Sequence, residues 1–366
     1  MRWTTEVRIG ARIIAPDQPT YFIADIAANH DGDLARAKAL IWEAKEAGAD
    51  CAKFQHFLAK DIVSDPGFRA LGRDQQAHQA KWKRSVYEVY EQYQTPRDWT
   101  PALAAECAAA EIDFMTTPYD LAAIENVDPY LEAFKVGSGD IGWPAFIEAV
   151  ARRGKPVFLA TGAADMDDVK RAVDAALAVN PQLCLMQCNT NYTGELENFR
   201  YVNLTVLRTY AMKWPGMVLG LSDHTPGHAA VLGAVTLGAR AVEKHFTDDN
   251  AREGPDHGFA MNPHTWAEMV ARTRELEYAL GDGEKRIEGN ELQSSIVQRR
   301  CLRLKRDLPA GHILCTDDLE ALRPRTAGSV EPYEIAAVLG RPLSHALSCG
   351  DALTWDAVAA IQRARA

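Results

Sequence analysis

The sequence predicts an α/β protein with a (β/α)8 TIM barrel followed by a small, mainly β domain. Short apolar runs alternate with amphipathic runs from residue 21 to about residue 280, and eight of the apolar runs have the length of strands. After residue 296 the pattern changes to short strands and turns. Alternating strands and helices indicate a parallel sheet, and eight such units can close into a barrel. A chain of 366 residues has room for a barrel and an appended domain.

The elements follow in chain order. Residues Val7–Ile14 alternate as a small hairpin would, and such a hairpin could close the bottom of the barrel. Strands are predicted at Tyr21–Ala27, Cys51–Gln55, Asp113–Thr117, Ala133–Val136, Pro156–Ala160, Leu183–Gln187, Met217–Leu221 and Ala239–Val242. Helices are predicted at Leu34–Ala47, Pro101–Ala110, Ile141–Arg152, Asp165–Ala178, Leu204–Lys213 and His228–Leu237. The alternative, an open dinucleotide-binding sheet, lacks a Gly-x-Gly-x-x-Gly after its first strand.

Three parts are expected along the chain. The catalytic barrel is predicted over residues 1–281, and a polar stretch over residues 282–296 is predicted to be a linker. Residues 297–366 are predicted to form the small β domain. A module of about seventy residues buries only a modest core, so it is expected to dock on a barrel or on a second subunit.

Composition excludes several classes of function. The net charge of −10 argues against a nucleic-acid surface, and no apolar stretch has the length of a membrane span. The first residues contain no apolar signal segment, and the seven cysteines are an odd number without tight pairing. A cytoplasmic location is therefore expected. An anionic ligand would need Lys and Arg concentrated at its site.

Every predicted strand ends in polar residues or is followed by them. They include Asp25, Asn29, Lys53, Gln55, Thr117, Asp120, Lys135, Ser138, Thr161, Asn191, Tyr192, Ser222, His224, Glu243 and His245. The carboxyl ends of barrel strands meet at one rim, so these residues predict one site there. For Thr117 or Asp120 alone, a helix cap or a turn is the preferred interpretation.

Two lysines are placed where they should be buried. Lys53 and Lys135 each follow an apolar run and are expected to point into the barrel mouth. An unpaired buried ammonium group is costly, so each needs a carboxylate partner or an anionic ligand. Hydroxyl groups are expected nearby on Ser138, Thr161 and Ser222. They favour a phosphate or carboxylate ligand; an internal ion pair with Asp25 or Glu243 is the alternative.

Two imidazoles end adjacent strands. His224 alone, or His245 alone, would more simply be a hydrogen-bonded core histidine, but the two together favour a metal site. Their donor chemistry suits Mn, Fe, Co or Zn. His257 could be a third ligand or could contact a substrate instead.

Several motifs together resemble one family. They are Ile23–Asp33, Ala52–Gln55, Ser85–Glu88, Lys135–Ser138, Ser222–Thr225, Glu243–Thr247 and Gly254–His257. Their order and spacing resemble the sialic acid synthase family, and the tail resembles its C-terminal antifreeze-like (SAF) domain. That resemblance implies condensation of phosphoenolpyruvate with an N-acetylmannosamine-type sugar, which releases phosphate and gives a nine-carbon 2-keto-3-deoxy acid.

The resemblance also implies roles. Phosphoenolpyruvate would contact Lys53, Lys135, Ser138, Thr161, Tyr192 and Ser222. The acceptor sugar would contact Asp25, Gln55, Asn191, Glu243, Asp256 and Arg323, and the catalytic set would be Asp25, Lys53, Glu243 and Asp256. A divalent metal, usually Mn or Mg, would bind His224 and His245. Arg323 would reach the site of a partner subunit, which implies a domain-swapped homodimer.

Four departures from the family pattern bear on the substrate. They are Asp25 for Glu, Ala160 for Ser, the absence of Pro after Tyr192, and Arg325 for Gly after Arg323-Pro324. Most of them touch the acceptor or the loop over it. Two alternatives therefore stay open: the same chemistry on a legionaminic, pseudaminic or other ulosonic acid precursor, and a non-catalytic carbohydrate-binding paralogue.

Overall fold

The first compact part of the chain is a closed parallel barrel. The computed structural model describes residues 3–71 and 78–359, and their contacts divide the chain into units of residues 1–281 and 282–366. The barrel strands are β3 (Tyr21–Asp25), β4 (Cys51–His56), β5 (Asp113–Pro118), β6 (Phe134–Val136), β7 (Val157–Ala160), β8 (Leu183–Cys188), β9 (Val218–Asp223) and β10 (Ala239–His245). They pair in chain order, and β10 closes the ring against β3. The predicted barrel is confirmed.

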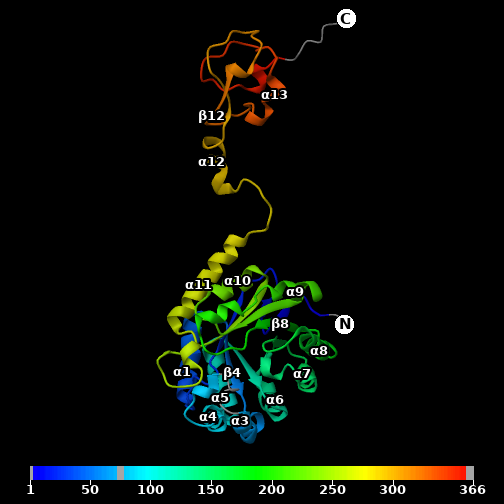
Figure 1. The fold of residues 1–366 in the computed structure, drawn as a ribbon, viewed down its shortest axis with the longest axis vertical. Helices are drawn as coiled ribbons and strands as arrows, with labels where there is room; N and C mark the ends of the chain where they lie inside the picture. The colour runs from blue at the N-terminus through cyan, green and yellow to red at the C-terminus, as the bar shows by residue number, and fades with distance from the viewer. Residues whose placement is uncertain (1–2, 72–77, 360–366) are drawn as a thin grey trace. The chain divides into compact units, whose positions relative to one another are not determined.

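Each strand is buried on both faces because helices cover the outside of the ring. On β3, Phe22 and Ala24 pack outward into the large core beneath the helices, while Tyr21 and Ile23 point into the barrel. The covering helices are α1 (Leu34–Glu46), α5 (Thr100–Ala109), α6 (Leu121–Val127), α7 (Pro144–Ala151), α8 (Met166–Leu177), α9 (Val206–Lys213), α10 (Ala229–Thr236) and α11 (Pro263–Leu280) (Figure 1). Asp120 accepts a hydrogen bond from the backbone of Ala123 and so caps α6, as its position predicted.

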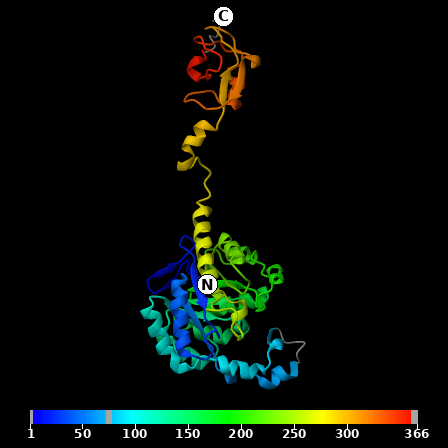
Figure 2. The same ribbon diagram turned by 90° about the vertical axis from the view of Figure 1, so that its left-hand side faces the viewer.

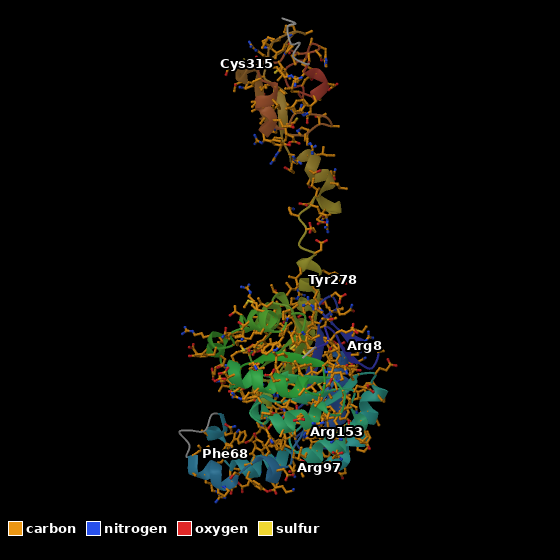
Figure 3. All side chains as sticks on the ribbon, turned by 90° about the vertical axis from the view of Figure 1, so that its right-hand side faces the viewer. Arg8, Phe68, Arg97, Arg153, Tyr278 and Cys315 are labelled. Carbon is orange, nitrogen blue, oxygen red and sulfur yellow. The ribbon has the colours of Figure 1, made fainter. Side chains whose placement is uncertain are left out.

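A hairpin closes the amino-terminal end of the barrel. Strands β1 (Val7–Ile9) and β2 (Arg12–Ile14) pair antiparallel, and Figure 3 marks Arg8 on them. Val7, Ile9 and Ile14 belong to the same buried cluster as the first inward-facing residues of the barrel strands. The predicted hairpin is therefore present, and it fills the base of the barrel.

The connection from β4 to α5 is unusually long and was not predicted. It contains α2 (Ala59–Ile62), α3 (Asp65–Leu71) and α4 (Val86–Tyr93). Figure 2 shows this segment standing out from the ring of helices, and Figure 3 places Phe68 on it. Ser85 begins α4 with a capping box to Glu88. The segment brings aromatic residues to the barrel mouth.

The second compact unit is small and mainly β. Strands β11 (Cys301–Leu304) and β12 (Leu319–Leu322) pair antiparallel, and further single bridges join its turns. Its own core includes Leu302, Leu314 and Val330. Two short helices accompany the strands, α12 (Leu292–Val297) and α13 (Ile335–Val338). The predicted β module is confirmed, but α12 occupies part of the stretch that was predicted to be a linker.

No helix in the described parts of the chain is long and apolar enough to span a lipid bilayer.

Candidate active site at the barrel mouth

The inward-facing positions change from apolar to polar along the strands. On β3, Ile23 lies in the apolar floor and Asp25 is the next inward position. On β10, Ala241 lies in the floor, and Glu243 and His245 follow at every second residue. Because side chains alternate between the two faces of a strand, this spacing stacks a charged layer directly on the floor and a histidine above it.

The charged layer consists of two buried ion pairs that touch each other. Lys53 Nζ lies 2.6 Å from Asp25 Oδ2, and Lys135 Nζ lies 2.8 Å from Glu243 Oε1. Lys53 also approaches Glu243 Oε1 at 3.7 Å. None of the four side chains is more than 6% exposed. The internal ion pairs that the sequence left as an alternative are thus present in this structure.

Neighbouring polar groups complete this layer. The Gln55 amide donates to Asp25 Oδ2 at 2.9 Å, and the Ser222 hydroxyl donates to Glu243 Oε1 at 3.3 Å. The second carboxylate oxygen of Glu243, Oε2, is buried and has no hydrogen-bond partner in the described structure. A buried oxygen without a donor is costly. Glu243 Oε2 is therefore available to accept a hydrogen bond from a ligand.

Electrostatics keep the Asp25–Lys53 pair charged. Burial alone would raise the pKa of Asp25, but the Lys53 ammonium and the Gln55 amide lower that pKa to about 2. Burial opposes the charge on Lys53, and the carboxylates of Asp25 and Glu243 overcome it and raise its pKa. Attraction across a short distance in a dry interior outweighs desolvation here.

The two predicted imidazoles lie together above this layer. The ring centroids of His224 and His245 are 5.4 Å apart. His224 Nδ1 lies 3.0 Å from the backbone oxygen of Asn189, to which it donates. His245 Nδ1 is buried without a hydrogen-bond partner, and burial lowers the pKa of His245 to about 3. A neutral ring with a free buried nitrogen is a good metal ligand.

The donor set fits a divalent cation held chiefly by imidazole. The nearest carboxylates to His245 are Asp25, 3.8 Å from Nε2, and Asp256, 3.7 Å from Nδ1. Among residues 3–71 and 78–359, no three His, Cys, Asp or Glu side chains form a ready-made metal cluster. Burial opposes charge on His224, but its hydrogen bond with the Cys188 thiol raises its pKa, so a bound cation would compete with a proton there. Any other ligands would come from water or substrate.

His257 does not join these ligands. Its Nδ1 lies 2.7 Å from Thr247 Oγ1 and its Nε2 lies 2.9 Å from Asp31 Oδ1. Both ring nitrogens are therefore engaged. The role of a third metal ligand, considered from the sequence, is not supported by this arrangement.

A pocket opens beside His245. Its cavity volume is about 120 Å³, and it is open to solvent. Its lining residues are Ala28, Gln55, Phe57, Ile62, Trp82, Val89, Tyr90, Tyr93, Tyr119, Tyr192, His245, Pro255 and Asp256. The sequence located Gln55, Tyr192, His245 and Asp256 at this rim. The wall between Phe57 and Tyr93 was missed, although the length of the β4–α5 connection was a signal for it.

Three strand ends converge on Gly162. Its backbone N–H donates to the Ser138 hydroxyl at 3.0 Å. A Cβ at Gly162 would lie 1.9 Å from Thr190 Oγ1, 2.9 Å from Ser138 Oγ and 3.0 Å from Cys188 Sγ. An added Cβ would therefore force the Thr190 and Ser138 hydroxyls to move. Thr190 carried no predicted role, yet its hydroxyl stands in the same cluster as Ser138.

Three other predicted site residues are hydrogen-bonded elsewhere or belong to the second unit. The Thr161 hydroxyl donates to the backbone oxygen of Met186 and accepts from Tyr210, so it is already engaged in the barrel wall. The Asn191 side-chain oxygen accepts hydrogen bonds from neighbours in its own loop. Arg323 is exposed and belongs to the second unit.

Comparisons with known proteins agree over most of the chain. The sequence model of the NeuB family matches residues 40–285, and that of the SAF domain matches residues 299–359. The N,N'-diacetyllegionaminic acid synthase of Legionella pneumophila is 33% identical over 346 residues, which are 93% of this chain and 95% of that protein. The N-acetylneuraminate-9-phosphate synthase of Homo sapiens is 32% identical over 331 residues, 90% of each chain.

A solved structure is also similar. The N-acetylneuraminic acid (sialic acid) synthetase of Leptospira borgpetersenii matches with a TM-score of 0.69 at 25% identity, covering 80% of this chain and 96% of that one.

Proposed function

The chain belongs to the NeuB family, and from this membership we propose that it is an enzyme that condenses phosphoenolpyruvate with an aldose. The products would be a 2-keto-3-deoxy nonulosonic acid of the sialic type and inorganic phosphate. N-acetylmannosamine or a related sugar, such as a precursor of legionaminic or pseudaminic acid, would be the acceptor.

One observation carries the proposal: two buried ammonium groups lie within one connected charge layer beneath a pair of imidazoles. Lys53 and Lys135 share the Glu243 carboxylate, and His224 and His245 lie at the next level of the same barrel. Two fixed cations suit a ligand that carries both a carboxylate and a phosphate. Ser138, Thr161, Tyr192 and Ser222 would complete the phosphoenolpyruvate site.

The proposed reaction forms one C–C bond between the substrates and one C–O bond to water, and it breaks the C–O bond to phosphate. Carbon 3 of the enol attacks the aldehyde carbon, water adds to carbon 2, and the bond from carbon 2 to the phosphate oxygen breaks. Lys53 and Lys135 would stabilise the charge that gathers on the departing phosphate, without having to move. A divalent cation, Mn or Mg, held by His224 and His245 would polarise the aldehyde oxygen.

The acceptor would be oriented by polar groups in the aromatic-lined pocket. Asp25, Gln55, Asn191, Glu243 and Asp256 are proposed to bind its hydroxyl groups, Asp25 and Glu243 from the charge layer itself. Tyr and Trp rings in the wall suit the apolar faces of a sugar ring. The reaction is proposed to take place in the cytoplasm.

Arg323 is proposed to act on the acceptor from the SAF domain of a partner subunit. A domain-swapped homodimer is then required, and a mixing experiment tests it. Lys135→Ala and Arg323→Ala proteins, each inactive alone, should regain about a quarter of wild-type activity when subunits are exchanged, since half the dimers are mixed and hold one intact site. Mixtures that stay inactive after exchange would place Arg323 in its own subunit's site or outside the reaction.

A phosphate-release assay tests the proposed function itself. Purified protein with Mn²⁺ and phosphoenolpyruvate is given N-acetylmannosamine, mannose, and 2,4-diacetamido-2,4,6-trideoxy hexoses in parallel. Release that depends on one sugar and vanishes in Lys135→Ala supports the proposal and names the acceptor. Release with none of them would instead favour a carbohydrate-binding protein without catalysis.

A further inference from the structure

A buried histidine outside the proposed catalytic set joins two loops of the barrel rim. His257 lies in the loop that follows β10 and is fully buried. Its Nε2 donates to Asp31, in the loop that follows β3, at 2.9 Å, and Thr247 donates to its Nδ1 at 2.7 Å. The ring thus connects the two ends of its own loop and also the neighbouring loop.

The slot around this ring is closely fitted. A Cβ at Gly254 would lie 2.6 Å from His257 Cδ2 and 3.1 Å from His257 Nε2. The Asn250 amide donates to the backbone oxygens of His257 at 2.8 Å and of Ala260 at 2.7 Å. The loop therefore wraps the imidazole, and the imidazole fills it.

Asp31 is itself held in place. Arg36 Nε lies 3.1 Å from Asp31 Oδ2, and the same guanidinium pairs with Asp248 at the start of the loop after β10. An acceptor that is fixed from its other side makes the hydrogen bond from His257 more directional. The contact is a defined attachment point for the loop.

The attachment determines where Asp256 lies. Asp256 directly precedes His257, its Oδ2 accepts from the backbone of Ala28 at 3.3 Å, and the same oxygen lies 3.7 Å from His245 Nδ1. Asp256 also lines the pocket. Since one peptide unit separates the two residues, a shift of the His257 ring moves the carboxylate of Asp256.

We propose that His257 is a positioning residue that, through Asp31 and Thr247, fixes Asp256 for binding the acceptor sugar. This inference rests on the proposed function. The position of the loop after β10 would then depend on side chains that touch neither substrate. Phosphoenolpyruvate, bound at the charge layer below, would not depend on it.

The test compares four variants of the full chain. His257→Gln keeps one donor of the ring, Thr247→Val removes the hydroxyl at constant size, and Thr247→Ser restores it. Asn180→Ser is the control for the loss of buried hydrogen bonds, because Asn180 is buried, its amide donates to the backbone oxygens of Ala151 and Lys155, and it lies in the connection from α8 to β8, away from the barrel mouth. Amide hydrogen exchange and the KM for each substrate are measured for all.

The expected changes are confined to hydrogen exchange in the loop after β10 and to the KM for the acceptor. His257→Gln and Thr247→Val should raise the acceptor KM and the exchange of amides 249–261 by about tenfold, the worth of one hydrogen bond to a charged group. The KM for phosphoenolpyruvate should stay within about twofold. Thr247→Ser and Asn180→Ser should behave as wild type in both measurements.

Other results would overturn the inference. They are unchanged exchange in 249–261, an equal rise of KM for both substrates, or the same effect from Asn180→Ser. Failure of the proposed function looks different: wild-type protein would release no phosphate with any aldose, and exchange alone would then decide whether His257 fixes the loop.

Discussion

Lys53 and Asp25 occupy directly paired positions on β4 and β3, and their side chains meet inside the barrel with 2.6 Å between Nζ and Oδ2. Neither is more than 2% exposed. A contact between strand neighbours is fixed by the register of the sheet, so the pair is built before any ligand binds. Its strength can be measured directly.

Asp25→Asn should lower the free energy of unfolding by about 3 kcal/mol, because it leaves the Lys53 ammonium buried without its nearest counter-charge. Denaturant unfolding provides the measurement. Asp174→Asn, which breaks the exposed Lys170–Asp174 pair, should cost less than about 1 kcal/mol. Equal costs for the two variants would contradict the view that Lys53 depends on Asp25.

Gly162→Ala should lower phosphate release by about 100-fold, since the added Cβ would collide with Thr190 Oγ1 and displace Ser138. Most of the loss should appear as a higher KM for phosphoenolpyruvate. Gly139→Ala is the control, because a Cβ there meets nothing within 4 Å. If Gly162→Ala retains wild-type kinetics, the Ser138 and Thr190 hydroxyls do not hold the phosphate.

Dialysis against EDTA should abolish phosphate release, and Mn²⁺ should restore it, because the proposed aldehyde chemistry needs a cation at His224 and His245. His245→Ala should remain inactive when Mn²⁺ is added and should bind less Mn²⁺ by titration calorimetry. His56→Gln should respond as wild type does. Full activity in EDTA would rule out the metal.

The free energy of unfolding should decrease as the pH is lowered below 6.5, because of His56. Burial lowers the pKa of His56 to about 3, whereas the unfolded ring takes up its proton near pH 6.5. Between these values the unfolded chain binds more protons, so the contribution of His56 is complete above pH 6.5 and declines by about 1.4 kcal/mol per pH unit as pH falls toward 3. Unfolding curves from pH 7 to pH 4.5 measure it.

The His56→Gln variant lacks this pH-dependent contribution to stability. Its unfolding free energy should depend less steeply on pH than that of wild type below pH 6.5. Parallel curves for the two proteins would show that His56 does not remain neutral in the folded state.

The sequence located every barrel strand, but several strand ends were wrong. β9 continues to Asp223, beyond the predicted end at Leu221. β10 continues to His245, although its apolar pattern ends at Val242, because Glu243 and His245 point into the polar layer. β3 ends at Asp25, before the apolar residues Ile26 and Ala27. The family resemblance is confirmed by the NeuB and SAF matches. Hydrophobic periodicity predicts strands well and fails where the interior is charged.

The site was predicted as a set of strand ends, and ion pairs of the buried lysines with Asp25 or Glu243 were named only as the alternative to an anionic ligand. That Lys53 pairs with Asp25 and Lys135 with Glu243 follows from strand register and from reach across the barrel, which a linear pattern does not encode. The aromatic wall was missed because it comes from a connection between strands. Contacts across loops depend on tertiary structure that local propensity cannot supply.

The hairpin β1–β2 packs against the amino-terminal end of the barrel, opposite the candidate site. Val7, Ile9 and Ile14 fill the floor, and the charge layer of Lys53 and Lys135 rests on it, with the aromatic-lined space beside His245 at the rim. A ligand at the charge layer would therefore bind before a ligand at the rim and leave after it. For the proposed reaction, this arrangement favours an ordered sequential mechanism. Phosphoenolpyruvate would bind before the sugar, and the nonulosonic acid would dissociate before phosphate.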